Sequence, residues 1–104
     1  MYGETIEKVY GGLKPGLLKD IQSVAQKHNV EKVVLFGSRA RGDYKERSDI
    51  DIAFQGGDAN GFILEVDEEI QTLLKFDIVD LNRPVQEELL QSIENEGIVI
   101  YEKI

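Results

Sequence analysis

Three stretches of the chain carry apolar residues at the spacing of an amphipathic helix. The apolar positions recur every three or four residues and therefore fall on one side of a helix. We expect these helices over residues 16–28, from Phe62 to Leu74, and from Asn82 and Pro84 to Gly97. The apolar stripe of the second helix, which we assign to the core, consists of Phe62, Ile63, Val66, Ile70 and Leu73.

Four shorter stretches have the pattern of β-strands. They are Lys32–Phe36, Ser48–Phe54, Phe76–Leu81 and Ile98–Tyr101. The first is almost wholly apolar, which predicts a central strand. In the second, acidic or small residues alternate with apolar ones, as in a strand that is buried on one face. With a tight turn or short helix over residues 38–43, the predicted order along the chain is α-β-turn-β-α-β-α-β.

The length and composition of the chain fit one domain. It has 104 residues, of which 41% are hydrophobic and 31% are charged, a balance that argues against disorder. We expect a single domain over residues 1–104, in which residues 1–14 form a flexible arm. The sequence has no apolar run of about 18 residues, no signal-peptide pattern and no cysteine. We therefore expect no membrane binding and a cytoplasmic location.

The charge balance is acidic, with a formal net charge of −8 at pH 7. Proteins that bind duplex nucleic acid usually carry a basic surface, so we expect no direct binding to duplex nucleic acid. An acidic domain can still bind one nucleotide where local basic groups and Mg²⁺ neutralise the phosphates. Four basic residues lie close together between Ser38 and Asp49, namely Arg39, Arg41, Lys45 and Arg47.

Two aspartates, Asp49 and Asp51, lie two positions apart in the second predicted strand. Their side chains leave the same face with Cα atoms roughly 6.5 Å apart, so both carboxylates can converge on one cation. Mg²⁺ prefers oxygen ligands and commonly takes carboxylates together with substrate phosphates. If the third strand lies beside the second, Asp77 can reach the same cleft, and three acidic groups could hold two metal ions. Asp77 could alternatively act as a general base, and we prefer it to Asp80 because it lies nearer the start of its strand.

A phosphate-binding turn is predicted where the first strand ends at Gly37 and Ser38. Glycine admits unusual backbone dihedral angles and close approach, while backbone N–H groups and the Ser38 hydroxyl can donate hydrogen bonds to phosphate oxygens. Arg39 and Arg41 are candidates for binding the phosphate charge, or alternatively for surface ion pairs with acidic neighbours. Ser48 precedes the acidic pair and could donate a hydrogen bond to a carboxylate or bond the backbone of the strand.

The segments Gly37–Gly42 and Ser48–Asp51 together resemble the signature of the DNA polymerase beta-like nucleotidyltransferase superfamily. Their spacing and the chain length are similar to those of its minimal nucleotidyltransferase (MNT) group, over residues 15–101. The resemblance implies an α/β (α+β) fold with a small mixed sheet of about four strands and helices packed against it. It implies a triphosphate-binding turn at Gly37 and Ser38, and Mg²⁺ ligands, for two ions, at Asp49, Asp51 and Asp77.

The same resemblance implies transfer of AMP from ATP, with release of pyrophosphate. Many members of the MNT group are antitoxins that are paired with a HEPN ribonuclease toxin, and some silence the toxin by adenylylating one of its tyrosines. The length agrees with such a role, because the catalytic sheet and its helices use most of the chain and leave no room for an acceptor-binding domain. The acceptor must then come from a partner protein or from another subunit; we expect a partner protein, in a hetero-oligomer.

An acidic domain also suits docking to a basic partner, because complementary charge favours association. Two alternatives stay open at this point. The chain could be a non-catalytic antitoxin that neutralises its partner by binding alone, or a nucleotidyltransferase that acts on a small molecule.

Overall fold

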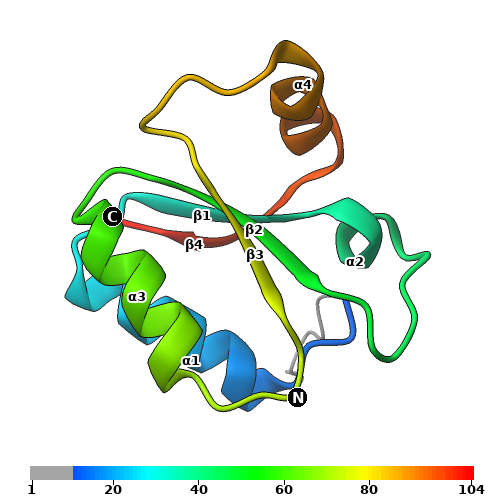
Figure 1. Ribbon diagram of the computed structural model, residues 1–104, viewed down its shortest axis with the longest axis horizontal. Helices are drawn as coiled ribbons and strands as arrows, with labels where there is room; N and C mark the ends of the chain where they lie inside the picture. The colour runs from blue at the N-terminus through cyan, green and yellow to red at the C-terminus, as the bar shows by residue number, and fades with distance from the viewer. Residues whose placement is uncertain (1–10) are drawn as a thin grey trace, which may run out of the picture.

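The computed structural model describes residues 11–104, which form a sheet with helices on both faces (Figure 1). Most of the predicted flexible arm, residues 1–10, lies outside the described residues. The helices are α1 (Pro15–Lys27), α2 (Gly37–Arg41), α3 (Ala59–Glu69) and α4 (Glu87–Glu96). The strands are β1 (Lys32–Phe36), β2 (Ile50–Gln55), β3 (Phe76–Asp80) and β4 (Ile98–Glu102).

The sheet is mixed and has four strands in the order β3-β2-β1-β4. β1 pairs antiparallel with both β2 and β4, whereas β2 and β3 run parallel. The parallel pair is possible because α3 provides the crossover between β2 and β3. β1 is central, and its apolar side chains are buried from Val33 to Phe36. The predicted α/β fold with a small mixed sheet is confirmed.

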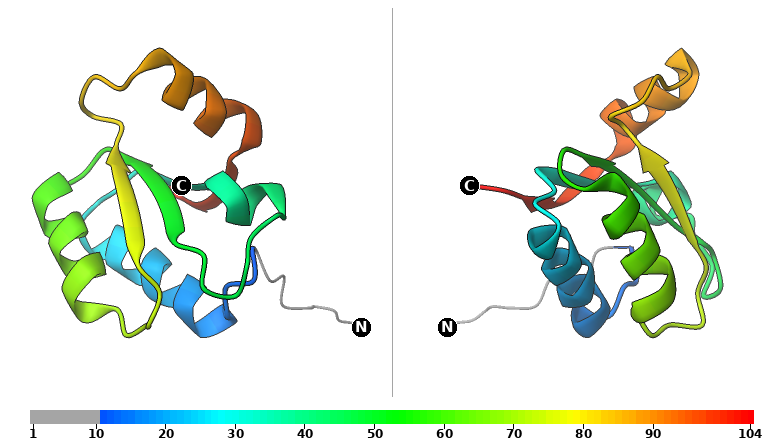
Figure 2. Two further views of the ribbon diagram at one scale, coloured as in Figure 1. Left: turned by 45° about the vertical axis from the view of Figure 1, so that its right-hand side comes forward. Right: turned by 60° about the vertical axis from the view of Figure 1, so that its left-hand side comes forward.

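Each face of the sheet is covered by a different pair of helices (Figures 1 and 2). α1 and α3 pack on the face to which β2 contributes Ile50, Ile52 and Phe54, all fully buried. α2 and α4 lie on the opposite face, where Ala53 belongs to a smaller cluster with Ile93. The alternation of β2 therefore assigns its apolar residues to the α1–α3 side and its aspartates to the α2–α4 side.

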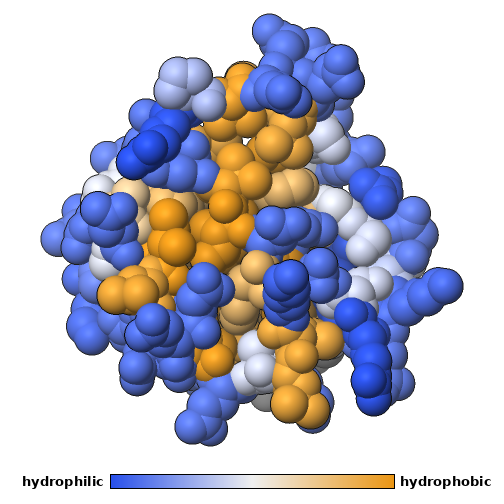
Figure 3. All heavy atoms as spheres, viewed as in Figure 1, coloured by the Kyte–Doolittle hydropathy of each residue, from blue (hydrophilic) through white to orange (hydrophobic). Residues whose placement is uncertain are grey.

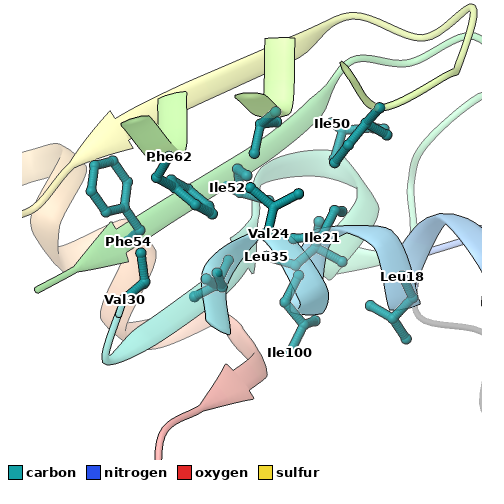
Figure 4. Packing of buried hydrophobic residues seen from close by; sticks show 14 of the residues in the cluster. Leu18, Ile21, Val24, Val30, Leu35, Ile50, Ile52, Phe54, Phe62 and Ile100 are labelled. Atoms are coloured by element: carbon teal, nitrogen blue, oxygen red, sulfur yellow. The ribbon is translucent and has the colours of Figure 1, made fainter. Parts of the chain in front are cut away.

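The larger core lies between the sheet and the α1–α3 pair (Figure 4). The rings of Phe54 from β2 and Phe62 from α3 meet with centroids 4.8 Å apart. Burying a side chain of this size stabilises the fold by about 1.5–3 kcal/mol relative to leaving it exposed. Ile21 from α1 is likewise fully buried in this cluster. These contacts fix β2 in one register against two helices.

The two covering helices are also tied together at their polar ends. His28, which caps α1, bonds the carboxylate of Glu65 of α3 through Nε2 at 2.8 Å, and Lys27 pairs with the same carboxylate at 3.0 Å. The His28 bond, followed by the Lys27 bond, lowers the pKa of Glu65. Asp58 begins α3 by accepting a hydrogen bond from the Gly61 backbone N–H at 3.2 Å. His28 therefore has a structural role in holding α1 to α3.

Several boundaries differ from the sequence-based expectation. β2 begins at Ile50 rather than Ser48, which leaves Asp49 just before the strand, and α3 begins at Ala59 rather than Phe62. α3 ends at Glu69 instead of continuing to Leu74, and Leu73 is fully exposed rather than part of the core. α4 begins at Glu87 rather than near Asn82. The reason is that the Asn82 side chain is used in a turn: its Oδ1 accepts from Gly56 N at 2.8 Å, and its Nδ2 donates to Asp80 at 2.9 Å.

Apolar side chains are also visible on the outside of the molecule, as a band across the face seen in Figure 1 that is bordered by hydrophilic residues (Figure 3). In the part of the chain that the structure describes, the exposed large apolar residues are Leu64, Leu73, Val99 and the terminal Ile104. No helix among residues 11–104 is long and apolar enough to cross a bilayer.

We predict that Phe62→Ala destabilises the protein by about 3–5 kcal/mol, because it leaves a cavity against Phe54 in the core. Leu73→Ala is the control, with an expected change within about 0.5 kcal/mol because the side chain is exposed. Denaturant-induced unfolding of both variants measures the two free energies. Comparable losses in the two variants would contradict the assignment of Phe62 to the core and of Leu73 to the surface.

Candidate active site

Asp49 and Asp51 are placed by the apolar residues that flank them. Ile50 and Ile52 are fully buried toward α1 and α3, so the side chain of Asp51 leaves β2 on the opposite face. Asp51 is half-buried, and Asp49, which immediately precedes the strand, is exposed. β2 therefore presents the half-buried Asp51 carboxylate, and the exposed Asp49 carboxylate lies one residue before the strand.

Asp77 lies next to Asp51 on the neighbouring strand. In the parallel pairing of β2 with β3 the register matches Asp51 with Asp77, and residues matched in this way share a face of the sheet. Asp80 is matched with Phe54, which belongs to the other face, and its carboxylate bonds Asn82 and Arg83 instead. The structure thus brings Asp77, and not Asp80, to the same place as Asp51.

Asp77 and Asp49 lie close enough to Asp51 to act on its charge. Partial burial raises the pKa of Asp51, the charges of Asp77 and Asp49 raise it further, and the nearby Arg41 and Arg39 oppose the shift. Like charges held this close disfavour each other's ionised form, and a bound cation would relieve the repulsion. Within residues 11–104, however, no three acidic or histidine side chains already form a group that could hold a metal ion.

The turn after β1 touches the acidic site directly. Gly37 has φ of +74°, and a Cβ atom there would collide with the Asp51 carboxylate. Phe36, the preceding residue, is also the register partner of Asp51 across the β1–β2 pair. Only glycine combines this backbone conformation with such a close approach. Gly37 therefore lies beside the Asp51 carboxylate, and the half-buried Ser38 follows it, which is a placement suited to a turn that receives phosphates.

The donor set fits a hard cation. The site offers carboxylate oxygens from two adjacent strands, which is the ligand chemistry that Mg²⁺ prefers. The described chain has no cysteine, and its histidine, His28, lies on the α1–α3 side and bonds Glu65. Asp49, Asp51 and Asp77 are accordingly the residues that would hold a metal ion here.

Three other candidate residues have partners of their own. Arg39 is buried and its guanidinium bonds backbone carbonyls of the loop that follows α2. Arg41 is exposed and pairs with Asp43 at 3.3 Å and Glu96 at 3.2 Å, and these two bonds, Glu96 first, raise its pKa. Ser48 accepts a hydrogen bond from the Lys45 backbone N–H through Oγ at 2.8 Å, within the same loop.

Two hollows of the surface lie away from this site. One of about 520 Å³ is lined by residues at the chain end with Glu31 and Gln55, and another of about 330 Å³ lies between α4 and the sheet. Both include Lys32 and Gln55, which mark the start of β1 and the end of β2. Asp51 lies toward the opposite end of β2, so its pairing with Asp77 and its contact with Gly37, and not the size of a hollow, locate the candidate site.

Comparison with known proteins agrees with this geometry. The family model described as "Polymerase beta, Nucleotidyltransferase" matches residues 19–104. The chain belongs to this nucleotidyltransferase family. It is 35% identical over 82 residues to the "Putative protein adenylyltransferase MJ0604" of Methanocaldococcus jannaschii, an alignment that covers 69% of this chain and 79% of the relative. The expected membership of the MNT group is confirmed.

Solved structures share the fold. A chain of the toxin–antitoxin complex MntA–HpeT superposes with a TM-score of 0.66 at 22% identity, covering 83% of this chain and 73% of the other. A Sulfolobus solfataricus protein described as a "putative nucleotidyltransferase" superposes with a TM-score of 0.54 at 27% identity, covering 85% and 79% of the two chains. This nucleotidyltransferase therefore has the architecture of its family across the sheet and the helices.

We predict that Gly37→Ala destabilises this nucleotidyltransferase by about 1–2 kcal/mol from the positive φ alone. The added Cβ must also displace the Asp51 carboxylate, which increases the loss. The control is Gly16→Ala in α1, where a Cβ has nothing within 4 Å; here we expect a gain of about 0.4–1 kcal/mol. Denaturant unfolding compares the two variants, and a Gly37→Ala protein as stable as wild type would contradict the described turn.

Proposed function

We propose that the protein transfers AMP from ATP to a partner protein in a Mg²⁺-dependent reaction. The observation that carries the proposal is the in-register pairing of Asp51 with Asp77 beside the Gly37 turn. This arrangement sets carboxylate oxygens for a cation next to a backbone that a triphosphate can approach. Membership of the nucleotidyltransferase family supplies the reaction class.

In this proposal each residue has a defined task. Asp49 and Asp51 would hold Mg²⁺, with Asp77 as the third carboxylate for two ions, while Gly37 and Ser38 would receive the triphosphate. Bound Mg²⁺ would neutralise phosphate charge and lower the pKa of an attacking hydroxyl. Asp77 is exposed at the edge strand, so it can alternatively take the proton of that hydroxyl and pass it to solvent.

The bond changes follow directly. The acceptor oxygen attacks the α-phosphorus in line, the bond from that phosphorus to the bridging oxygen of the β-phosphate breaks, and pyrophosphate leaves. The backbone at Gly37 and Ser38 would stabilise the charge on the triphosphate. Arg41 reaches Asp43 and Glu96 from an exposed position, so we propose that it exchanges these partners for phosphate oxygens when ATP binds.

A protein acceptor is supported by two observations. The Methanocaldococcus jannaschii relative carries the name of a protein adenylyltransferase. The net charge of −8 suits a basic partner surface.

The structural neighbours point to the kind of partner. One is a toxin–antitoxin crystallised with AMP-PNP, and another is the MntA–HpeT complex in which two aspartates, two positions apart, are changed to glutamate. We propose that this protein is the antitoxin of such a pair, and that its partner and acceptor is a HEPN ribonuclease toxin.

The reaction is tested by incubating the protein with its genomic neighbour, Mg²⁺, and ATP labelled at either the α- or the γ-phosphate. We expect transfer of the α label only. Asp49→Asn combined with Asp51→Asn should reduce transfer by at least about 10²-fold, because the metal-dependent stabilisation of the transition state is lost. Asp67→Asn, on the exposed side of α3, is the control and should leave transfer unchanged. Absence of α-label transfer by wild type would refute the proposal.

The same double variant separates modification from binding. If the antitoxin acts by adenylylation, co-expression of Asp49→Asn/Asp51→Asn with the toxin should fail to rescue growth, whereas Asp67→Asn should rescue it. Full rescue by the double variant would show that binding alone neutralises the toxin. Binding of the toxin by each variant, measured by size-exclusion chromatography, controls for loss of the complex.

A further inference from the structure

Arg39 is the buried charged residue of the described chain, with only 3% of its surface exposed. It lies in α2, two positions after Gly37, and would be expected at the surface of so short a helix. A buried guanidinium needs hydrogen-bond acceptors for its donors, or it destabilises the fold. The acceptors that Arg39 uses therefore show what it does.

Among residues 11–104, the Arg39 side chain makes four hydrogen bonds, all to backbone carbonyl oxygens. Nε and Nη2 donate to Ser48 O at 3.1 and 2.9 Å, and Nη2 also donates to Glu46 O at 3.2 Å. Nη1 donates to Gly11 O at 2.7 Å, across 28 positions of the sequence. The planar guanidinium, with donors on two sides, thus joins the segment before α1 to the loop between α2 and β2.

Further contacts close around the same side chain. The Arg39 guanidinium lies over the Tyr44 ring, 5.0 Å from its centroid. A Cβ on Gly11 would meet Arg39, and a Cβ on Gly12 would meet the Tyr44 ring. Both glycines have positive φ, +56° and +73°. Both positions therefore require glycine, because a larger residue would collide with these side chains and would be strained by the positive φ.

The Ser48 carbonyl oxygen, which accepts two of the hydrogen bonds from Arg39, lies directly before the acidic pair in the sequence. Ser48 closes the loop with Lys45: its N–H donates to Lys45 O at 3.0 Å, and its Oγ accepts from Lys45 N at 2.8 Å. Asp49 is the next residue, and β2 begins one residue later. Asp49 lies outside the pairing of β2 with its neighbouring strands, so its backbone is held between the fully buried Ile50 on one side and Ser48 on the other.

We propose that Arg39 is a positioning residue of the active site, which fixes Asp49 by holding Ser48 against Gly11. Arg39 acts through the loop and does not contact the nucleotide. The proposal rests on the proposed function for its catalytic consequence, while its structural content, the order of residues 45–49, is independent of that function.

The test replaces Arg39 by Lys, which keeps the charge but lacks the fork of donors needed to bridge Ser48, Glu46 and Gly11 at once. We expect amide hydrogen exchange at Lys45 and Ser48 to become at least about 10-fold faster, because the equilibrium between the closed and open states of the loop shifts toward the open state. Exchange at Gly42 N, which bonds Ser38 O in α2, should stay unchanged. Arg83→Lys, at an exposed ion pair with Asp80, is the matched control.

Two further measurements report on the position of Asp49. Affinity for Mn²⁺, measured by electron paramagnetic resonance without nucleotide, should fall at least several-fold in Arg39→Lys, and kcat for transfer should fall more than KM for ATP rises. Arg83→Lys should match wild type in both. Because Lys preserves the charge near Asp51, wild-type behaviour of Arg39→Lys in exchange and in Mn²⁺ affinity would overturn the proposal and leave Arg39 with an electrostatic role only.

A second variant covers the case in which Arg39→Lys fails to fold. Gly11→Ala introduces a Cβ against Arg39 from the other side and should also speed exchange at Ser48. Unchanged exchange in a folded Gly11→Ala protein would overturn the proposal. If wild type transfers no AMP, the proposed function fails, while exchange and Mn²⁺ affinity still decide whether Arg39 positions Asp49.

Discussion

The parallel, in-register pairing of β2 with β3 creates the acidic site. It sets Asp51 beside Asp77 on one face of the sheet, although their like charges oppose each other and raise the pKa of Asp51. The sheet maintains this contact because the other face of β2 is fully buried. Ile50 and Ile52 could leave the core only if the strand slipped by one residue, and such a slip would turn every side chain of β2 to the wrong face.

The unfavourable contact between Asp51 and Asp77 is therefore maintained by apolar packing on the opposite face of β2. Phe54 and Phe62 lock β2 to α3, and α3 is in turn the crossover that makes the β2–β3 pair parallel. On the α2–α4 side of β2, the Asp51 carboxylate occupies the space that a side chain at position 37 would need. A glycine at this position therefore makes room for the carboxylate. The division of β2 into an apolar face and an acidic face explains stability and chemistry together.

Local patterns were sufficient to predict most of this arrangement. The alternation in residues 48–54 indicated which face carries Asp49 and Asp51, and the glycine after β1 marked the turn; fold class and family are confirmed. The helix boundaries could not be predicted, because they depend on contacts between residues that are distant in the sequence. Leu73 fits the apolar spacing of the second predicted helix, but α3 ends at Glu69. The bonds of Asn82 to Gly56 and Asp80 hold it in a turn, so α4 begins later than expected. The roles of the individual site residues stay predictions.

Arg39 shows the same limit within the signature itself. Its position between Gly37 and Asp49 suggested phosphate binding, yet its partners are carbonyls, one of them at Gly11, and no local pattern links residue 11 to residue 39. Arg41, two positions later, is exposed with its ion pairs at the surface. One short helix thus places two similar cations in different surroundings. The donors of the buried arginine go to backbone carbonyls and those of the exposed arginine to surface carboxylates, so two basic residues this close in sequence need not share a function.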